Sequence, residues 1–532
     1  MSPRKRPPAP PLPLYRTLPV RLLALAVSLV LIVVALVQLL TPLLHIQIER
    51  DRAGTTPVTV FRPATNPGPP VVVSHGFAGS RSLMQTYALA LARDGYTVVT
   101  YDSLGHGSNP EPLAGDLDKP EGATAHLLAQ LDQVVDYARA LVPGEQRVAL
   151  LGHSMATDIL VRHTVEHPDT SATIALSLYS PEITAQIPHN LLVLVGALEQ
   201  GTLKGEAMKA VGMVAGLPRP EPGVTYGQRE DNTLRRWDTV PGVEHVGILF
   251  STRGAREAAD WLDFVLERPG TPGAAVAVLP WVALLLAGTG LLGWFLFQFL
   301  PRATPRKSPP SLKWGPFLLL ALVPAVLTPP VARMLPTDFL PTLVGDYLMV
   351  HCALYGLFTA LGLALWRRLG RGAPVAPRSW PVAAPRTLMV LALSTLLVTA
   401  YTFLGFIFPT NDFITVVIPG ASRLPVAAFA VLAVLPFILA DETLVRAPSG
   451  TLGAAAVTRL LFLLSLGAAI ALDFQSLFFL IVLLPLLAVF LLIYMLISWW
   501  AWRQTGHVLP GAIAEALGLS FLIAAAFPIV SG

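Results

Sequence analysis

The feature that most constrains this chain is a series of long apolar segments. A helix needs about 20 mostly apolar residues to cross a bilayer core. One such segment follows a basic, proline-rich leader (residues 1–21) and predicts a membrane anchor within residues 22–44, while the others predict an all-α transmembrane domain of about eight helices over residues 271–532. The expected spans are Leu22–Leu40, Ala274–Leu300, Pro316–Ala332, Tyr347–Trp366, Leu388–Phe408, Val426–Ala440, Leu460–Leu472, Leu477–Trp500 and Ala512–Val530.

Composition supports this interpretation. Only 13% of the residues are charged, about half of the quarter that is typical of soluble proteins, which excludes a fully soluble chain and a disordered one. A cleaved signal peptide is the alternative for the first segment, but its apolar run is longer than a signal h-region and no A-x-A site follows it. The single cysteine, Cys352, lies in an apolar segment and cannot form an intrachain disulfide.

Lysine and arginine gather in alternate loops, and cytoplasmic loops usually carry this excess. With a cytoplasmic N-terminus, residues 45–270 would lie outside the cytoplasm of a multi-pass cell-membrane protein. The net charge of +4, held in clusters beside apolar segments, therefore indicates membrane topology and no nucleic-acid partner. The loops assigned to the cytoplasm carry Arg4, Lys5, Arg6, Arg302, Arg306, Lys307, Lys313, Arg367, Arg368, Arg371, Arg378, Arg386, Arg446, Arg459 and Arg503, against Arg333, Arg423, Asp338, Asp346 and Asp412 on the other side.

Residues 45–270 are more polar and alternate short β-rich runs with helical patterns. Several of the strands are continuous apolar runs, as expected when helices cover both faces of a sheet. The alternation predicts a mostly parallel α/β sheet. The expected strands are Val58–Arg62, Val71–Ser74, Thr97–Tyr101, Val148–Leu151, Thr173–Leu178, Leu191–Val195 and Arg235–Val240, and the expected helices are Leu83–Arg93, Ala123–Leu141, Met155–Glu166, Leu203–Ala215 and Gly254–Glu267.

The sequence Gly152-His153-Ser154-Met155-Ala156 directly follows an apolar strand and opens a helix. A serine on such a tight turn exposes its hydroxyl beside backbone N–H groups, and small neighbours let the turn form. Ala156 stands where the G-x-S-x-G pattern has its last glycine. The alternative interpretation is a serine that only caps the helix.

Another loop, His75-Gly76-Phe77, follows the VVV strand. A pair of this kind at this place supplies a backbone N–H to an oxyanion hole, so the predicted donors are the amides of Phe77 and Met155. A glycine-rich turn without chemistry is the alternative.

A histidine and a carboxylate complete the pattern. His245 follows the last expected strand and can act as a general base, and Glu199 is the first carboxylate after the penultimate strand. The chain order Ser…acid…His favours these two residues. Glu206, Asp231 and Asp238 compete with Glu199 for the role of the acid.

With these motifs, residues 56–268 resemble the α/β-hydrolase superfamily, especially its serine aminopeptidase and monoacylglycerol-lipase-like branch. The resemblance is carried by His75-Gly76, Asp102…Gly105-His106-Gly107, Gly152-His153-Ser154-Met155, Gly196…Glu199 and His245. It implies Ser154 as nucleophile, His245 as base and Glu199 as acid, with no metal and no organic cofactor. Asp102 to Gly107 is expected to be a shaped loop without a catalytic group.

This chain departs from that family at three places. Ala156 replaces the glycine, Glu199 stands where aspartate is commoner, and the stretch Leu178–His189, where many relatives insert a lid, is short. The short stretch implies a site that is open, or one that is covered by the membrane or by a partner.

Polar residues inside the apolar segments are candidates for function. Asp441-Glu442 followed by Arg446 is similar to the first motif of the CAAX-protease and bacteriocin-processing membrane family, and Thr505–Ile513 resembles its end segment. Asp473 and Glu515 stand where that family needs histidines, so the ligand set for intramembrane catalysis is incomplete. We expect helix-end charges, with Asp441 and Glu442 paired to Arg446, in a domain that serves as an anchor or substrate gate.

The sequence thus predicts a membrane-anchored serine hydrolase that cleaves an ester, thioester or amide through an acyl-enzyme. The lipid bilayer is its expected partner, and a small-molecule, lipid or peptide acyl compound is its expected substrate. An acyltransferase with the same triad is an alternative, and so is a transporter or channel with a non-catalytic hydrolase-like module. The sequence leaves the oligomeric state open.

Overall fold

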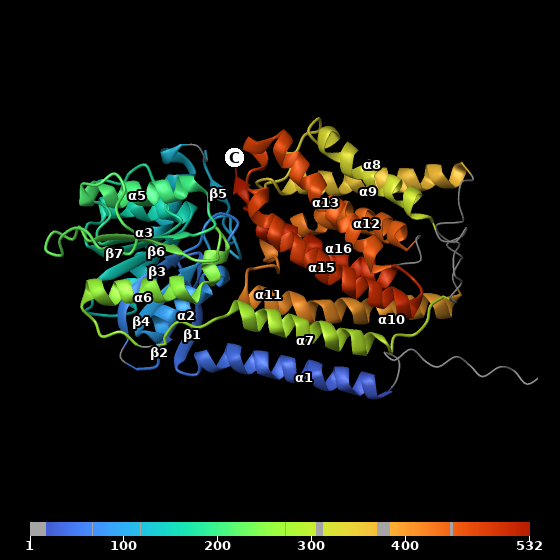
Figure 1. Cartoon of the computed structure of the whole chain (residues 1–532), viewed down its shortest axis with the longest axis horizontal. Coiled ribbons are helices and arrows are strands. Elements are labelled where there is room, and N and C mark those ends of the chain that lie inside the picture. The colour runs from blue at the N-terminus through green and yellow to red at the C-terminus, as the bar shows by residue number, and fades with distance from the viewer. Residues whose placement is uncertain are drawn as a thin grey trace, which may run out of the picture.

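The computed structural model describes residues 18–65, 67–116, 119–271, 273–304, 312–369, 384–446 and 451–531. Most of the leader (residues 1–17) lies outside the described residues, as do the predicted cytoplasmic charges Arg306, Lys307, Arg371 and Arg378. The described chain forms an α/β domain beside a helical domain (Figure 1).

The α/β domain is built on one eight-stranded sheet with the order β1-β2-β4-β3-β6-β7-β8-β9. Strands from β4 to β9 in this order pair in parallel, whereas β1 and β2 pair antiparallel at one edge. The parallel core confirms the predicted fold class. The strands are β1 (Ile46–Ala53), β2 (Thr56–Pro63), β3 (Gly68–Ser74), β4 (Tyr96–Tyr101), β6 (Val148–His153), β7 (Thr170–Leu176), β8 (Leu191–Gly196) and β9 (Arg235–Val240).

Helices cover both faces of this sheet because its central strands are buried on both sides. On one face, α2 (Gln85–Arg93) and α6 (Thr252–Leu266) share a core with alternate strand residues such as Val71 and Val73. On the other face, α3 (Ala125–Ala140) and α4 (Met155–Glu166) pack on Val72 and its neighbours, and α5 (Gly201–Ala215) packs on β8. All five predicted helices are present with small shifts at their ends.

Strand β1 was not predicted. Its sequence, IQIERDRA, lies at the edge of the sheet and buries only its first and last residues. Charged side chains on an edge strand discourage pairing with strands of other chains. They also interrupt the alternation of apolar and polar residues by which a strand is predicted from sequence.

Nine helices in the described part of the chain are long and apolar enough to cross a membrane, and each coincides with a predicted span. They are α1 (Leu18–Leu40, extended by a short turn to Leu43), α7 (Leu279–Phe297), α8 (Trp314–Ala332), α9 (Gly345–Arg368), α10 with α11 (Pro385–Thr402 and Phe408–Phe413, joined by the wide turn Phe403–Ile407), α12 (Leu424–Val445, preceded by the turn Ala421–Arg423), α13 (Leu452–Leu472), α15 (Leu480–Thr505) and α16 (Leu509–Ala526); the short helix α14 (Phe474–Leu477) precedes α15.

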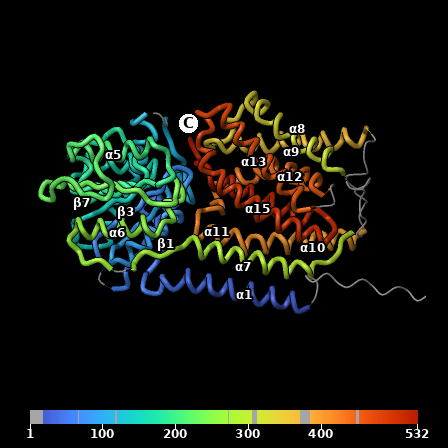
Figure 2. Tube along the Cα trace, viewed as in Figure 1, coloured from blue at the N-terminus to red at the C-terminus, as the bar shows by residue number. Residues whose placement is uncertain are grey.

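The helices run roughly parallel, with one set of ends against the α/β domain, and α1 lies beside α7 (Figure 1). The C-terminal end of the chain also lies at this boundary (Figure 2). There, β10 (Val530–Ser531) pairs in parallel with β5 (Leu113–Ala114) of the α/β domain. The fully buried Arg423 donates to the carbonyls of Phe527 (2.7 Å) and Gly105, and thereby ties a loop of each domain together.

Candidate active site

Ser154 occupies the sharp turn between β6 and α4. Its backbone has φ 53° and ψ −120°, which is an unfavourable conformation for a non-glycine residue. The turn is held by a hydrogen bond from the Ser154 amide to the Leu176 carbonyl (2.9 Å). A Cβ at Gly152 would lie 2.7 Å from the end of the Leu160 side chain, so any larger residue before the turn would force that side chain to shift. Ala156, in contrast, fits in the core with 1% of its surface exposed.

His245 lies between Ser154 and Glu199. Its Nε2 is 3.0 Å from Ser154 Oγ, and its Nδ1 is 3.3 Å from Glu199 Oε2. The three residues come from loops after β6, β8 and β9, and carboxyl ends of parallel strands meet at one edge of a sheet. The structure therefore brings the three predicted residues together, although they are spread over more than 90 positions.

The carboxylate of Glu199 is buried and fully engaged. Its Oε1 accepts hydrogen bonds from Ser177 Oγ (2.7 Å) and from the Gly196 amide (2.9 Å), which leaves Oε2 for His245. Burial opposes ionisation, but the hydrogen bonds from His245, Ser177 and Gly196 outweigh it and hold the pKa of Glu199 below its usual value. The group is thus a carboxylate at neutral pH and favours the tautomer of His245 that carries its proton on Nδ1.

Two neighbours hold the His245 loop. His153 Nε2 lies 2.9 Å from the His245 carbonyl oxygen, and burial, with a smaller effect of His245, lowers the pKa of His153 to about 3. His153 is therefore neutral and can donate this hydrogen bond. The carboxylate of Glu244 accepts from the amides of Val246 (2.8 Å) and Gly247 (2.7 Å), which fixes the turn after His245.

The loop that carries Phe77 packs directly on the serine turn. A Cβ at Gly76 would lie 2.8 Å from His153 Nδ1 and 3.1 Å from Ser154 Cβ. A side chain at this position would collide with the serine turn, and Phe77 is the residue that directly follows this close approach. Met155 provides the first amide of α4, directly after Ser154. The two residues predicted as oxyanion donors thus follow a close approach to the serine turn in one case and the serine itself in the other.

The loop after β4 supports this arrangement. Asp102 is fully buried and accepts from Arg81 Nη1 (2.6 Å) and Ser108 Oγ (2.7 Å), while the Ser103 amide donates to His75 Nε2 (3.0 Å). His106 completes the support, because its ring contacts both the His75 and Phe77 rings. The loop therefore acts as a scaffold.

The competing carboxylates lie elsewhere. Asp238 faces Arg253 (3.6 Å), Glu206 faces Lys209 (3.8 Å) and Asp231 is exposed. None of them is hydrogen-bonded to His245.

One group of residues in the described part of the chain has the arrangement of a metal site. Asp132 on α3, with His163 and His167 at the end of α4, offers ligand atoms within 4.8 Å of one another. His163 Nδ1 lies 2.7 Å from Asp132 Oδ1, so these two side chains form a direct hydrogen bond. This hydrogen bond joins α3 to α4 away from Ser154.

The helical domain reaches the predicted oxyanion loop, which sequence reasoning missed. The Phe77 ring stacks on Phe479, just before α15, with 3.7 Å between ring centroids. Ser80, three residues further along, accepts from the Val416 amide (3.1 Å) and contacts Thr415 Oγ1 (3.1 Å). No local sequence signal links residues about 400 positions apart.

Five charged residues of the helical domain form a separate buried cluster. Arg446 pairs with Glu442, as expected, and with Ser498 Oγ (3.1 Å). Asp441 pairs instead with Arg459, whose Nη2 also contacts Glu442 (3.1 Å) and Glu515 (2.9 Å). Asp473 stands apart and caps α14. The carboxylates are thus neutralised largely by arginines, and none of the contacts reaches Ser154.

Known proteins are similar to this chain mainly within the α/β domain. Residues 65–206 match the family described as serine aminopeptidase, S33. The Escherichia coli protein RutD, provisionally named a carbamate hydrolase, is 30% identical over 110 residues, or 21% of this chain and 37% of that protein. A Synechocystis protein provisionally named a non-heme chloroperoxidase is 26% identical over 120 residues, or 22% of this chain and 38% of its own. The chain thus spans little more than a third of these relatives.

Parts of the chain are also similar to solved structures. An epoxide hydrolase mutant from Vigna radiata is 23% identical, with a TM-score of 0.21, over 26% of this chain and 42% of its own. A membrane phospholipase A described as a bacterial virulence factor is 15% identical, with a TM-score of 0.31, over 46% of this chain and 94% of its own. The sheet order and the family match together show that the α/β domain is an α/β-hydrolase domain, of a kind found in enzymes.

Proposed function

We propose that this protein is a membrane-bound serine hydrolase in which Ser154 is the nucleophile, His245 the general base and Glu199 the orienting acid. The observation that carries the proposal is the continuous contact from the serine, held in a strained turn, through the imidazole to a buried carboxylate. This is the arrangement that turns a weakly nucleophilic hydroxyl into an effective one.

The proposed reaction has two steps. His245 Nε2 removes the Ser154 proton while Oγ attacks the carbonyl carbon of an ester, thioester or amide, and the leaving group departs with that proton. Water, deprotonated by the same imidazole, then attacks the acyl-enzyme, and the acid leaves as Ser154 regains its proton. The amides of Phe77 and Met155 would stabilise the negative oxygen of each tetrahedral intermediate, a contribution on the order of 3 kcal/mol for each donor.

We further propose that the reaction occurs outside the cytoplasm. The α/β-hydrolase domain lies at one set of helix ends, and the described basic residues Arg302, Lys313, Arg367, Arg386 and Arg503 lie in or just beyond the opposite end turns of their helices. Because such residues favour the cytoplasmic side, this distribution supports an extracytoplasmic hydrolase domain.

Labelling with a fluorophosphonate tests the nucleophile. The full chain in detergent should be labelled, and Ser154→Ala should lose all labelling and all ester turnover. Ser171→Ala is the matched control, because Ser171 lies at the start of β7, at the opposite end of the parallel sheet from the site. Labelling of Ser154→Ala at the rate of the wild type would refute the proposed nucleophile. Product analysis with an added acceptor alcohol checks the reaction type, since a hydrolase releases mainly the free acid and an acyltransferase mainly the new ester.

A further inference from the structure

Two histidines and one aspartate lie together where α3 and α4 cover the sheet, outside the proposed active site. Asp132 is on α3, His163 is on α4, and His167 is the residue after the end of α4. Their ligand atoms lie within 4.8 Å of one another, and this is the one such group among the described residues. His163 follows Ser154 by nine positions, which is about 14 Å along a helix. The group is therefore remote from the serine.

The distances within the group are close to those around a tetrahedral zinc ion. His163 Nδ1 lies 2.7 Å from Asp132 Oδ1, and His167 Nε2 lies 3.5 Å from the same oxygen. Zinc binds imidazole nitrogen and carboxylate oxygen at about 2.0 to 2.1 Å, so two ligand atoms of a tetrahedral ion are about 3.3 Å apart. A small rotation of the Asp132 side chain would therefore place all three atoms around one ion.

The backbone holds the two histidines on one side of α4. A spacing of four residues places their side chains one turn apart on the same face of a helix. The last hydrogen bond of α4 runs from the His167 amide to the His163 carbonyl (2.9 Å), and the Thr170 amide donates to the His167 carbonyl (3.1 Å). The two rings stack with 4.3 Å between their centroids. Two ligands are thus in position before an ion binds, which lowers the entropic cost of binding.

The burial of His163 indicates a role beyond helix packing. Its side chain is 1% exposed, and its Nε2 has no hydrogen-bond partner among the described residues. A buried polar atom without a partner costs free energy, and an apolar residue at this position would avoid that cost. A bound ion would offset it, because a neutral imidazole can keep its proton on Nε2 and offer the lone pair of Nδ1 to a metal.

The other two side chains leave the group open to solvent. The side chain of Asp132 is 35% exposed and that of His167 is 37% exposed, so an ion can enter from outside while His163 forms the inner wall. Arg139, two turns further along α3, is paired with Asp169. With both imidazoles neutral, the group carries the single negative charge of Asp132, which favours a cation.

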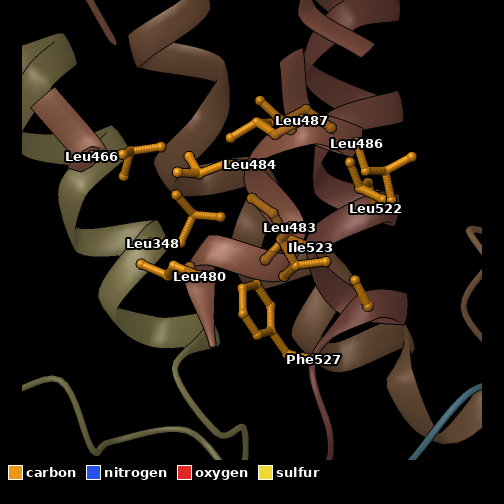
Figure 3. Close-up of a pocket in the computed structure, with 12 residues that line it drawn as sticks. Leu348, Leu466, Leu480, Leu483, Leu484, Leu486, Leu487, Leu522, Ile523 and Phe527 are labelled. Atoms are coloured by element: carbon orange, nitrogen blue, oxygen red, sulfur yellow. The ribbon is translucent and has the colours of Figure 1, made fainter. Parts of the chain in front are cut away.

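The described part of the helical domain offers no comparable set of ligands. Its buried carboxylates Asp441, Glu442 and Glu515 are paired with arginines. The cavity between the ends of α9, α13, α15 and α16 has a volume of about 20 Å³, and Figure 3 shows the apolar side chains that line it, such as Leu483 and Ile523. These side chains carry no atom that could bind an ion.

We propose that Asp132, His163 and His167 bind a zinc ion, with water as the fourth ligand, and that this ion clips α4 to α3. Zinc takes imidazole and carboxylate ligands together, whereas Ca²⁺ and Mg²⁺ take oxygen ligands. Because α4 begins directly after Ser154, the ion would stabilise the helix that follows the nucleophile turn without entering the reaction. The zinc site does not depend on the proposed hydrolase function.

Zinc binding by the full chain in detergent, without an affinity tag, tests the site. The protein is stripped with a chelator and equilibrated with buffered Zn²⁺ in the micromolar range, with Mg²⁺ and Ca²⁺ in excess, and the bound metals are measured by mass spectrometry. The chain has 11 histidines, so differences between variants, and not the total zinc, identify the site.

Loss of a ligand should weaken this binding. We expect Asp132→Asn and His167→Gln each to lower the zinc affinity by about tenfold or more, since even the loss of a partner beside a metal ligand costs roughly 10- to 100-fold. His126→Gln is the matched control, because His126 is exposed near the start of α3. Equal zinc binding by the wild type and both ligand variants, or a wild type that binds no zinc or retains Mg²⁺ or Ca²⁺ instead, would overturn the proposal.

A pair of substitutions at Asp132 separates metal binding from packing. Cysteine and serine are similar in size, but a thiolate is a strong zinc ligand and a hydroxyl is not among its usual ligands. Asp132→Cys should keep zinc and, with Co²⁺ in its place, show a thiolate-to-metal absorption band, whereas Asp132→Ser should lose both. Zinc should also raise the thermal midpoint of the wild type and of Asp132→Cys but not that of Asp132→Ser. A folded Asp132→Cys without the band and without the zinc-dependent shift would refute the site.

Discussion

Glu199→Gln tests the orientation of the base by changing one atom. In the wild type, Oε1 accepts from Ser177 and Gly196, and Oε2 accepts from His245 Nδ1. A glutamine is the same size, and its carbonyl oxygen will face the two donors because an NH₂ group there would meet two other donors. The NH₂ group must then point at His245.

This orientation reverses the role of the imidazole. An NH₂ group donates to Nδ1, so the neutral ring carries its proton on Nε2 and cannot accept the proton of Ser154. A change of this kind costs about 10⁴ in kcat where the geometry is kept, equivalent to about 5.4 kcal/mol of transition-state stabilisation. We expect the rates of ester turnover and of fluorophosphonate labelling at pH 7.5 to fall by that factor.

Ser177→Ala is the matched control for this prediction. It removes one hydrogen bond from Glu199 Oε1 but keeps the carboxylate and the tautomer of His245. A hydrogen bond to a charged group contributes about 1.5 kcal/mol or more, so we expect a loss of about tenfold. If Glu199→Gln, folded as judged by its thermal transition, kept more than a tenth of wild-type kcat, Glu199 would not be the orienting acid.

Three further predictions concern the site, the topology and one buried histidine. Gly76→Ala adds a methyl group where the predicted oxyanion loop touches the nucleophile turn, and should lower kcat by about 10²-fold, the effect of losing one donor, with little change in KM. The chain's single cysteine, Cys352, is buried, so an introduced surface cysteine can be labelled selectively. Glu230→Cys should react with an impermeant maleimide from outside the cell membrane, and Arg302→Cys should react only from the cytoplasmic side. The reverse pattern would invert the proposed topology. Burial lowers the pKa of His106 to about 3 in the folded protein, whereas an unfolded histidine has a pKa near 6.5. Between these two pH values the unfolded chain binds a proton at His106 that the folded chain does not. The free energy of unfolding therefore falls as the pH drops from about 6.5 towards 3. The thermal midpoint of His106→Gln should therefore fall less between pH 7 and pH 5 than that of the wild type, while the exposed control His126→Gln should follow the wild type.

The strands and membrane spans were predictable from the sequence because burial there follows a regular local pattern. Continuous apolar runs such as Val71–Val73 mark strands covered on both faces, and the long spans exceed what a soluble core helix needs. The chain order of the serine, acid and histidine then located three residues that the fold brings into contact. Each of these inferences depends on a pattern inside one helix or strand, or on the order in which helices and strands follow along the chain.

Contacts between the two domains follow no such rule. Arg423 was expected in an extracytoplasmic loop, but it is fully buried, and carbonyls of both domains accept hydrogen bonds from its Nη1 and Nη2. Asp441 was expected to pair with Arg446 on the same helix and pairs with Arg459 on the next. Helical spacing identifies partners within a helix, whereas a partner on another helix depends on packing that the pattern does not record.

The contact between Phe77 and Phe479 would let the helical domain support the proposed oxyanion donor without supplying a catalytic group. An oxyanion donor is effective only when it is fixed before charge develops, because moving it into place during the reaction would consume the stabilisation it offers. In this chain one side of the Phe77 loop is fixed by the hydrolase domain, through His75, His106 and the close approach of Gly76, and the other by a ring at the end of α15. The Phe77 loop is therefore held in place by contacts from both domains.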